Sequence, residues 1–196
     1  MKQSEVFLHG EADAWYERNK NKLCEGVDPV MDAMERYGIK PNSVLEVGCA
    51  NGWRLVQLNM KYKCKILGID PTDNSYMEGV LYRGEAADLG VIPSRCDTVI
   101  YGWCLYLCDP EDYFKISAEG DRVLTDGGFL IVYDFCTDHP YKVPYKHKKG
   151  IYSHHYDFSK LWSCHPAYSM YGRTVQDETC VTILKKNMQN AFPVEK

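Results

Sequence analysis

Apolar runs of four or five residues recur through the middle of the chain, separated by longer stretches with a helical pattern. Such runs occupy residues 43–47, 65–69, 98–101 and 129–133, and a weaker one lies at 80–82. Their length and apolar composition are typical of buried strands. Because the strands alternate with helices, the pattern predicts a parallel sheet with right-handed crossovers.

Helical patterns precede these strands and fill the gaps between them. They cover residues 12–22, 28–37, 52–61 and 110–124. In the second of them, Asp28 suits the N-cap, Pro29 the first helical position and Gly38 the stop. Asp109 is expected to cap the fourth helix, and Gly127-Gly128 to separate that helix from the fifth strand.

The last third of the chain has a different pattern. Residues 138–150 are rich in Pro, Tyr and Lys and are expected to form a loop, and residues 157–164 a short helix. Segments 167–174 and 179–185 resemble two strands around a polar turn. They predict an antiparallel hairpin at the end of the sheet.

Length and composition indicate one globular domain spanning residues 1–196. The 196 residues are 45% hydrophobic and 26% charged, which is close to the globular norm. The net charge of −4 and the pI of about 5.9 do not suggest a nucleic-acid-binding protein. No apolar run approaches the roughly 18 residues of a membrane span, so no membrane partner is expected. The odd number of cysteines and the polar, acidic N-terminus predict free thiols and a cytoplasmic location.

A glycine-bearing turn follows the first strand and runs into a helix. It reads Glu46-Val-Gly48-Cys49-Ala50-Asn-Gly52, and Asp70 closes the second strand 24 residues after Glu46. Glycine permits positive φ and a close approach of the backbone to a ligand, and helix N-termini attract polar groups. A carboxylate at the end of the second strand can accept both hydroxyls of a ribose. Ligands bind such sheets at the carboxyl ends of the strands, which predicts a nucleotide-type site here.

The stretch VLEVGCANG, followed by GID, resembles the E-x-G-x-x-x-G signature and second-strand acid of class I S-adenosylmethionine-dependent methyltransferases. The motifs 85–89, 97–101 and 122–130 follow in the order of that family. The resemblance implies an enzyme that uses S-adenosylmethionine, releases S-adenosylhomocysteine and methylates O or N of a small molecule. It also implies an α/β fold with a Rossmann-like, seven-stranded, mostly parallel sheet, helices on both faces and a C-terminal antiparallel hairpin.

The resemblance also implies the residues that bind the cofactor. They are Glu46, Gly48, Cys49, Ala50, Gly52, Asp70, Pro71, Ala87, Asp88, Leu89, Tyr101, Gly102 and Tyr16. The glycine turn and Glu46 would hold the methionyl part, Asp70 the ribose and Asp88 the adenine amine. Residues 1–40 would form a helical lid, although simple helix packing remains an alternative for them. Asp70 could instead be a turn residue before Pro71, and Asp88 a solvated loop carboxylate.

Residues 135–165 are dense in tyrosine and histidine and are the expected acceptor pocket. Four catalytic candidates lie in or beside this stretch: His154 or His147 as a base, and Asp134 or Tyr145 as an orienting group. The alternative is a lid packed by half-buried aromatic side chains. The string YKHKKGIYSxxYDFSKL loosely resembles methyltransferases of cell-surface carbohydrate pathways.

The lysines at 142, 146, 148 and 149 make this region locally basic within an acidic protein. They would attract an anionic or carbohydrate-linked acceptor, unless they are simply a solvated loop. No metal is expected, because the spacing of Cys104 and Cys108 has no second ligand pair to match it.

Two other functions remain open: an inactive S-adenosylmethionine-binding partner and a nicotinamide dehydrogenase. The missing third glycine argues against the dehydrogenase. The protein is expected to be a monomer or a homodimer.

Overall fold

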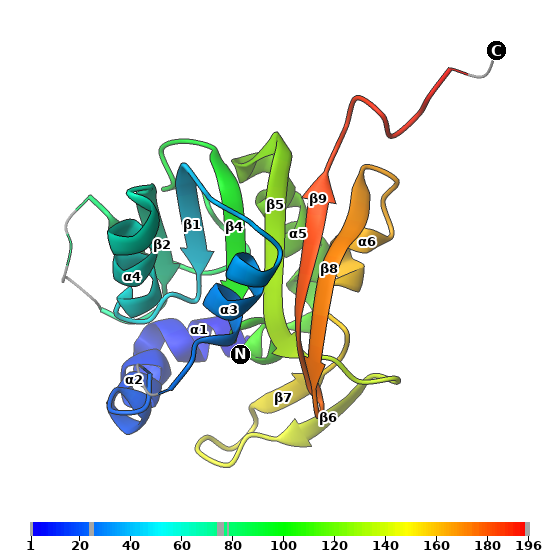
Figure 1. Ribbon diagram of the computed structural model, residues 1–196. Helices are drawn as coiled ribbons and strands as arrows, with labels where there is room; N and C mark the ends of the chain where they lie inside the picture. The colour runs from blue at the N-terminus through cyan, green and yellow to red at the C-terminus, as the bar shows by residue number, and fades with distance from the viewer. Residues whose placement is uncertain (1, 24–25, 74–76, 78, 195–196) are drawn as a thin grey trace.

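The computed structural model describes residues 2–23, 26–73, 77 and 79–194, which form an α/β fold around one central sheet (Figure 1). The strand order is β3-β2-β1-β4-β5-β9-β8. The parallel strands are β1 (Ser43–Val47), β2 (Lys65–Asp70), β3 (Leu81–Arg83), β4 (Cys96–Gly102) and β5 (Leu124–Phe135). β8 (Tyr168–Gln176) and β9 (Thr179–Lys186) form a hairpin that joins β5 in antiparallel pairing. The seven-stranded, mostly parallel fold predicted from the sequence is confirmed.

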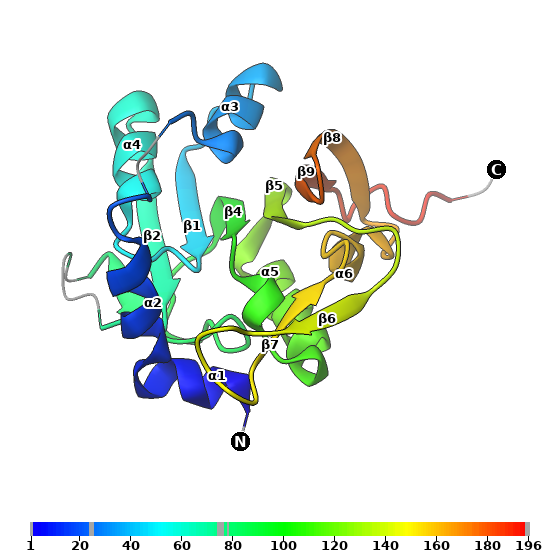
Figure 2. The ribbon, with the colours of Figure 1, turned by 90° about the horizontal axis from the view of Figure 1, so that it is seen from below.

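Helices cover both faces of this sheet, as the view along the molecule from below shows (Figure 2). α3 (Pro29–Arg36) and α4 (Trp53–Tyr62) lie on one face, and α5 (Tyr113–Val123) and α6 (Lys160–Ser163) on the other. Alternate residues of each strand enter two separate cores: Val44 faces α3 and α4, whereas Leu45 packs in the core beside α5. This alternation places Glu46 on the same face as Val44, toward α4.

The second predicted helix has the N-cap expected from the sequence. The Asp28 carboxylate accepts a hydrogen bond from the backbone N–H of Met31 at 2.8 Å, and Pro29 occupies the first helical position. Gly38 follows the helix with φ +68°. The local sequence was sufficient for this prediction because all the groups involved lie within one turn of each other.

The first helices of the chain lie beneath the carboxyl ends of the strands (Figures 1 and 2). They are α1 (Gln3–Val6), η1 (Phe7–Glu11) and α2 (Ala12–Asn19). The backbone N–H groups of Gln3 and Ser4 donate to the Asp109 carboxylate at 2.9 and 3.0 Å. Asp109 precedes η3 (Pro110–Asp112) but makes no side-chain cap there. The prediction that it caps the following helix was wrong, because its carboxylate is engaged by the distant start of α1.

Two further predictions need correction. Residues 138–150 are not only a loop, because β6 (Tyr141–Pro144) pairs antiparallel with β7 (Tyr152–His155) in a separate small sheet. The β7 backbone is supported from outside, since the Tyr152 N–H donates to the Gln3 side chain at 2.6 Å. β5 begins at Leu124, before Gly127-Gly128, and its pairing register shifts between Cys96 and Thr98. The glycine pair therefore lies within an irregular stretch of the strand and does not precede it.

None of the helices in the described part of the chain is long and apolar enough to cross a bilayer. The described cysteines are all free thiols, and Cys24 lies outside the described residues. A short helix, η2 (Leu105–Leu107), connects β4 to the segment that carries Asp109. This connection forms part of the site described next.

Candidate functional site

A cavity of about 340 Å³ lies at the carboxyl ends of β1, β2 and β4. Its volume is in the range of small-molecule pockets. Eight residues predicted from the sequence line it: Glu46, Gly48, Cys49, Ala50, Asp70, Pro71, Ala87 and Gly102. The N-terminal segment contributes Ser4, Phe7, Ala12 and Trp15 to the lining. The structure thus brings the glycine turn, the second-strand acid and the first helices to one space.

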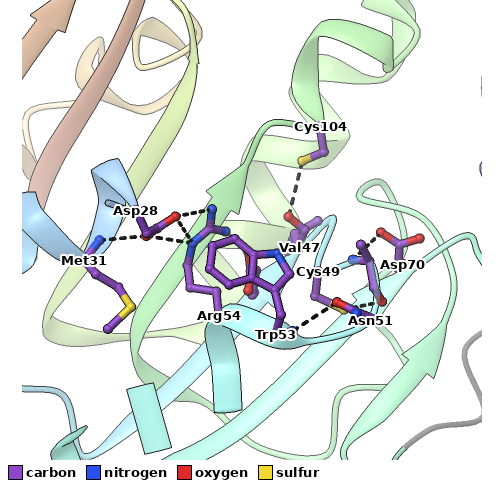
Figure 3. Close-up of polar contacts among 11 residues, drawn as sticks. Asp28, Met31, Val47, Cys49, Asn51, Trp53, Arg54, Asp70 and Cys104 are labelled. Atoms are coloured by element: carbon purple, nitrogen blue, oxygen red, sulfur yellow. Dashed lines mark hydrogen bonds and ion pairs between the residues drawn. The ribbon is translucent and has the colours of Figure 1, made fainter. Parts of the chain in front are cut away.

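The glycine turn is clamped between β2 and the segment after β4. The N–H groups of Gly48 and Cys49 both donate to the carbonyl of Ile69, at 2.8 and 3.3 Å. Gly48 has φ +76°, and a Cβ there would lie 2.4 Å from the Cβ of Cys104. The Cys104 thiol contacts the Val47 carbonyl at 3.3 Å (Figure 3). Close packing on both sides therefore requires glycine at position 48.

Asp70 connects the end of β2 to this turn. Its Oδ2 accepts from the Ala50 N–H and its Oδ1 from the Thr72 N–H, each at 2.9 Å (Figure 3 shows the first). Burial raises the pKa of Asp70, and these two N–H donors oppose the shift. The bond to Thr72 is the local turn foreseen as an alternative role. The bond to Ala50 is an additional contact, which ties the carboxylate to the glycine turn at the cavity.

A buried ion-pair network joins Glu46 to Asp28 through Arg54 of α4. Arg54 is 5% exposed. Its Nη1 donates to Oε1 of Glu46, its Nε lies 3.1 Å from both Asp28 oxygens, and its Nη2 is 2.9 Å from Asp28 Oδ2 (Figure 3). A Cβ at Gly102 would lie 2.6 Å from Nη1, so the glycine makes room for the guanidinium. All three charged residues line the cavity.

Sequence reasoning missed Arg54 as a site residue and treated Asp28 only as a helix cap. The available signal was an arginine two residues beyond Gly52, at the start of the helix that leaves the glycine turn.

Glu46 has one oxygen left over in this network. Its Oε2 is buried and has no hydrogen-bond partner among the described residues. Burial raises the pKa of Glu46 to about 7, although Arg54 opposes the shift. A buried carboxylate oxygen without a partner is unfavourable in the protein alone. A hydrogen-bond donor supplied by a ligand would satisfy this oxygen.

Five residues of the predicted cofactor set do not line the cavity: Gly52, Asp88, Leu89, Tyr101 and Tyr16. Asp88 is exposed, and its carboxylate accepts from the Gly90 N–H at 3.0 Å. Leu89 is fully buried in the core beside α5.

The other three have different surroundings. The Tyr101 hydroxyl donates to the Ile116 carbonyl at 3.3 Å, on the α5 side of the sheet. Gly52 is the N-cap of α4 with φ +73°. The Tyr16 hydroxyl accepts from Asn51 at 3.3 Å, beside the glycine turn.

Asp134, one of the four catalytic candidates, is fully buried at the end of β5. Its Oδ2 accepts from the N–H groups of Leu105 and Tyr106 at 2.9 and 3.3 Å, and its Oδ1 from Phe135 at 2.8 Å. Burial raises the pKa of Asp134 to about 7 against these donors. The carboxylate holds the η2 segment against β5 and does not line the cavity.

The remaining candidates belong to the β6–β7 hairpin. The Tyr145 hydroxyl accepts from Arg18 at 3.0 Å and donates to Glu11 at 3.3 Å, and so ties the hairpin to α2 and η1. His147 is exposed. His154 lines a second cavity of about 840 Å³, and its buried Nδ1 has no partner among the described residues. Residues 108–116 contribute to the lining of both cavities, but the structure does not bring the four candidates together.

An aromatic wall forms part of the first cavity. Trp103 directly follows β4 and has φ +61°, a conformation that is strained for a bulky residue. Its ring packs against Tyr106, Tyr133 and Phe135 with centroids 5.0–5.4 Å apart. Trp103 and Tyr133 both line the cavity. The signal in the sequence was a tryptophan at the carboxyl end of a central strand.

Comparisons with known proteins agree with this fold. Residues 45–132 match the family model described as a methyltransferase domain. A 1,6-didemethyltoxoflavin N1-methyltransferase from Burkholderia thailandensis, crystallised with its didemethyltoxoflavin ligand and S-adenosylhomocysteine, superposes with a TM-score of 0.72 at 12% identity. The alignment covers 93% of this chain and 88% of that one. A search of curated proteins found no significant match.

Two other solved structures are similar in fold. An S-adenosylmethionine-dependent methyltransferase from Methanosarcina mazei has a TM-score of 0.62 at 15% identity, covering 83% of this chain and 99% of that one. An O-methyltransferase family protein from Burkholderia thailandensis has a TM-score of 0.60 at 11% identity, covering 96% and 64%. The family match spans the glycine turn, the second-strand acid and strands β1 to β5, on which the site is built. Residues 45–132 therefore match a methyltransferase domain, and the whole chain shares its fold with S-adenosylmethionine-dependent methyltransferases.

Proposed function

We propose that the protein transfers a methyl group from S-adenosylmethionine to an oxygen or nitrogen atom of a small molecule. One observation carries the proposal: the cavity at the strand ends unites Glu46, the Gly48–Ala50 turn and Asp70. The match of residues 45–132 to the methyltransferase domain supports the same class of enzyme.

The residues present fit this cofactor. The α-ammonium of its methionyl part would supply the donor that Oε2 of Glu46 lacks. The Asp70 carboxylate, which lines the cavity, would accept the ribose hydroxyls, and the apolar side chain of Ala87 lies where the adenine is proposed to bind. Tyr16, next to Asn51 of the turn, is proposed to flank the methionyl end.

The cofactor supplies a methyl carbon already activated by a positively charged sulfur. What remains for the protein is to align the acceptor with that carbon and to exclude water, and positioning can account for much of the rate. Trp103 and Tyr133 present aromatic surface at the end of β4 and β5 for this purpose. Asp134 is proposed to orient the η2 segment through its backbone hydrogen bonds.

The acceptor is proposed to be anionic or carbohydrate-linked. Lys142 and Lys160 line the second cavity beside His154, and that cavity shares the segment 108–116 with the first. His154 is the proposed base, because burial and Lys142 lower the pKa of its ring and its Nδ1 has no partner among the described residues. His147 and Tyr145 are proposed as further polar groups at the hairpin.

Solved neighbours include an N-methyltransferase and an O-methyltransferase family protein, so either acceptor atom is consistent with the fold.

A second candidate function is a cofactor-binding partner that does not catalyse. It is favoured by one observation: none of the four catalytic candidates lines the first cavity. For either function we propose a cytoplasmic monomer or homodimer, and the free thiols of the described cysteines support the reducing compartment.

Calorimetry with S-adenosylhomocysteine tests the site. We expect Asp70→Ala to weaken binding at least about thirtyfold, through loss of two charge-assisted hydrogen bonds to the ribose. Asp138→Ala, which removes an exposed carboxylate outside the cavity, should leave the affinity unchanged. Equal affinities for the two variants would contradict the proposed cofactor site.

A methyl-transfer screen separates the two functions. Sugar phosphates, carboxylates and amines would be offered with S-adenosylmethionine, and product formation with any of them identifies the enzyme. Tight cofactor binding without product from any acceptor class would favour the non-catalytic partner.

A further inference from the structure

The guanidinium of Arg54 is divided unequally between two carboxylates. Asp28 takes the Nε and Nη2 edge, with three contacts of 2.9–3.1 Å, and Glu46 receives only Nη1. A carboxylate that pairs with two N–H groups of an arginine at once fixes how the guanidinium is turned. Asp28 holds the guanidinium in this way, and in the resulting orientation only Nη1 reaches Glu46, whose Oε2 stays without a partner among the described residues.

We propose that Asp28 is a specificity-determining residue for the amino-acid part of the cofactor, acting through Arg54 to keep one oxygen of Glu46 available to the methionyl ammonium. The inference rests on the proposed function, because it concerns the same cavity. It adds a role that sequence reasoning did not assign, since Asp28 belongs to the start of α3 and lies outside the glycine turn.

The charges of the network support this role. Glu46, Arg54 and Asp28 together carry one net negative charge when all three are ionised, and all are at most about one-tenth exposed at their side chains. A buried cluster with one uncompensated charge is unfavourable without a further partner. One ammonium group from a ligand would balance it. If Arg54 paired with Glu46 alone, the pair would be neutral and would have no net charge to attract a cation.

The surroundings show that the network faces a ligand space as well as the core. Asp28, Arg54 and Glu46 all line the first cavity, together with Gly48 of the turn. Trp53, next in the chain to Arg54, covers the guanidinium at 4.9 Å from its ring and helps to hold it in place (Figure 3). Asp28 also receives the Met31 N–H, which fixes its carboxylate relative to α3. The Trp53 ring and the Met31 N–H therefore help to fix the positions of Arg54 and Asp28 relative to each other.

The test compares two ligands that differ only in the amino-acid part. S-Adenosylhomocysteine has the ammonium, whereas 5′-methylthioadenosine keeps the adenosine and the thioether without it. In Asp28→Asn the side-chain oxygen still caps α3, but the charge that holds the arginine edge is lost. We expect calorimetry to show at least about tenfold weaker binding of S-adenosylhomocysteine and a change below about twofold for 5′-methylthioadenosine.

Matched variants control for loss of structure. Asp32→Asn removes a carboxylate from the same helix, where it pairs with Arg36 on the surface, and should change neither affinity. Arg54→Lys is a second test of the proposal. A lysine ammonium lacks the planar set of N–H donors with which the guanidinium holds both carboxylates. This variant should reproduce the selective loss of S-adenosylhomocysteine even if Asp28→Asn does not fold.

Each outcome bears on the proposal. A parallel loss of both ligands, or no loss of S-adenosylhomocysteine in a folded Asp28→Asn protein, overturns it and leaves the cofactor site standing. Wild-type protein that binds neither ligand overturns the proposed function, and this inference with it.

Discussion

Gly48 is constrained by both its own backbone and its neighbour. Its φ is +76°, and a Cβ would collide with Cys104 at 2.4 Å. Gly38 has a similar φ of +68° but no atom of the described residues within 4 Å of the Cβ position, which makes it a matched control. Gly48→Ala should therefore destabilise the protein by about 2–4 kcal/mol and Gly38→Ala by about 1 kcal/mol in urea unfolding. Equal losses of stability in the two variants would show that the Cys104 side chain can move away from the added methyl group at no cost.

At the residue scale, the sequence predicted the members of the site that belong to one local motif. Glu46, Gly48 and Asp70 were found because each has a defined place relative to a strand end. The pairing of Arg54 with Asp28 was not found, because the two lie 26 positions apart and meet only when α3 and α4 pack on the same face. The roles of His154 and Asp88 stay predictions.

At the scale of elements, α1 depends on a carboxylate more than a hundred residues away. Asp109 accepts from the N–H groups of Gln3 and Ser4, and Gln3 is buried. Asp109→Ala should destabilise the protein by about 1–3 kcal/mol, because donors near the start of α1 lose their acceptor. It should also speed hydrogen exchange in residues 3–19 and weaken S-adenosylhomocysteine binding, since this segment lines the cavity.

Asp112→Ala is the control for this element. It removes the ion pair with Lys2, whose side chain is about half exposed, and a pair of that kind contributes little. If the two variants exchange equally fast in residues 3–19, Asp109 does not anchor the helix.

The strands of the central sheet were easier to predict than its attachments. Parallel strands are buried on both faces, so they stand out as apolar runs in the sequence. The β6–β7 hairpin contains exposed Lys142 and Pro144 and gave no such signal. Its contacts with Gln3 and Arg18 are long-range, and no local pattern predicts them.

At the scale of the whole molecule, two buried carboxyl groups should make stability fall as the pH rises. Burial raises the pKa of both Glu46 and Asp134 to about 7, from ordinary values near 4.5 and 3.8. Between those ordinary values and about 7, the folded cofactor-free protein binds more protons than the unfolded chain. Its free energy of unfolding therefore decreases with rising pH over that window.

Glu46→Gln isolates the contribution of one group. Because its side chain does not ionise, the stability difference between wild type and variant should shift by up to about 3 kcal/mol against the wild type from about pH 4.5 to about pH 7. Urea unfolding without cofactor across this range measures it. A constant difference would mean that Glu46 stays ionised throughout, held by Arg54.

By itself, the sequence determined the central strands, their parallel arrangement and the glycine-turn motif, because these follow from hydrophobic periodicity and residues close together in the chain. The tertiary structure alone decided which charged groups meet. The Asp109 carboxylate accepts from the start of α1 and does not cap the helix that follows it. Asp28 and Glu46 both pair with the guanidinium of Arg54. Such pairings depend on how helices pack across a sheet, and in a buried site that packing determines which polar atom is left for a ligand.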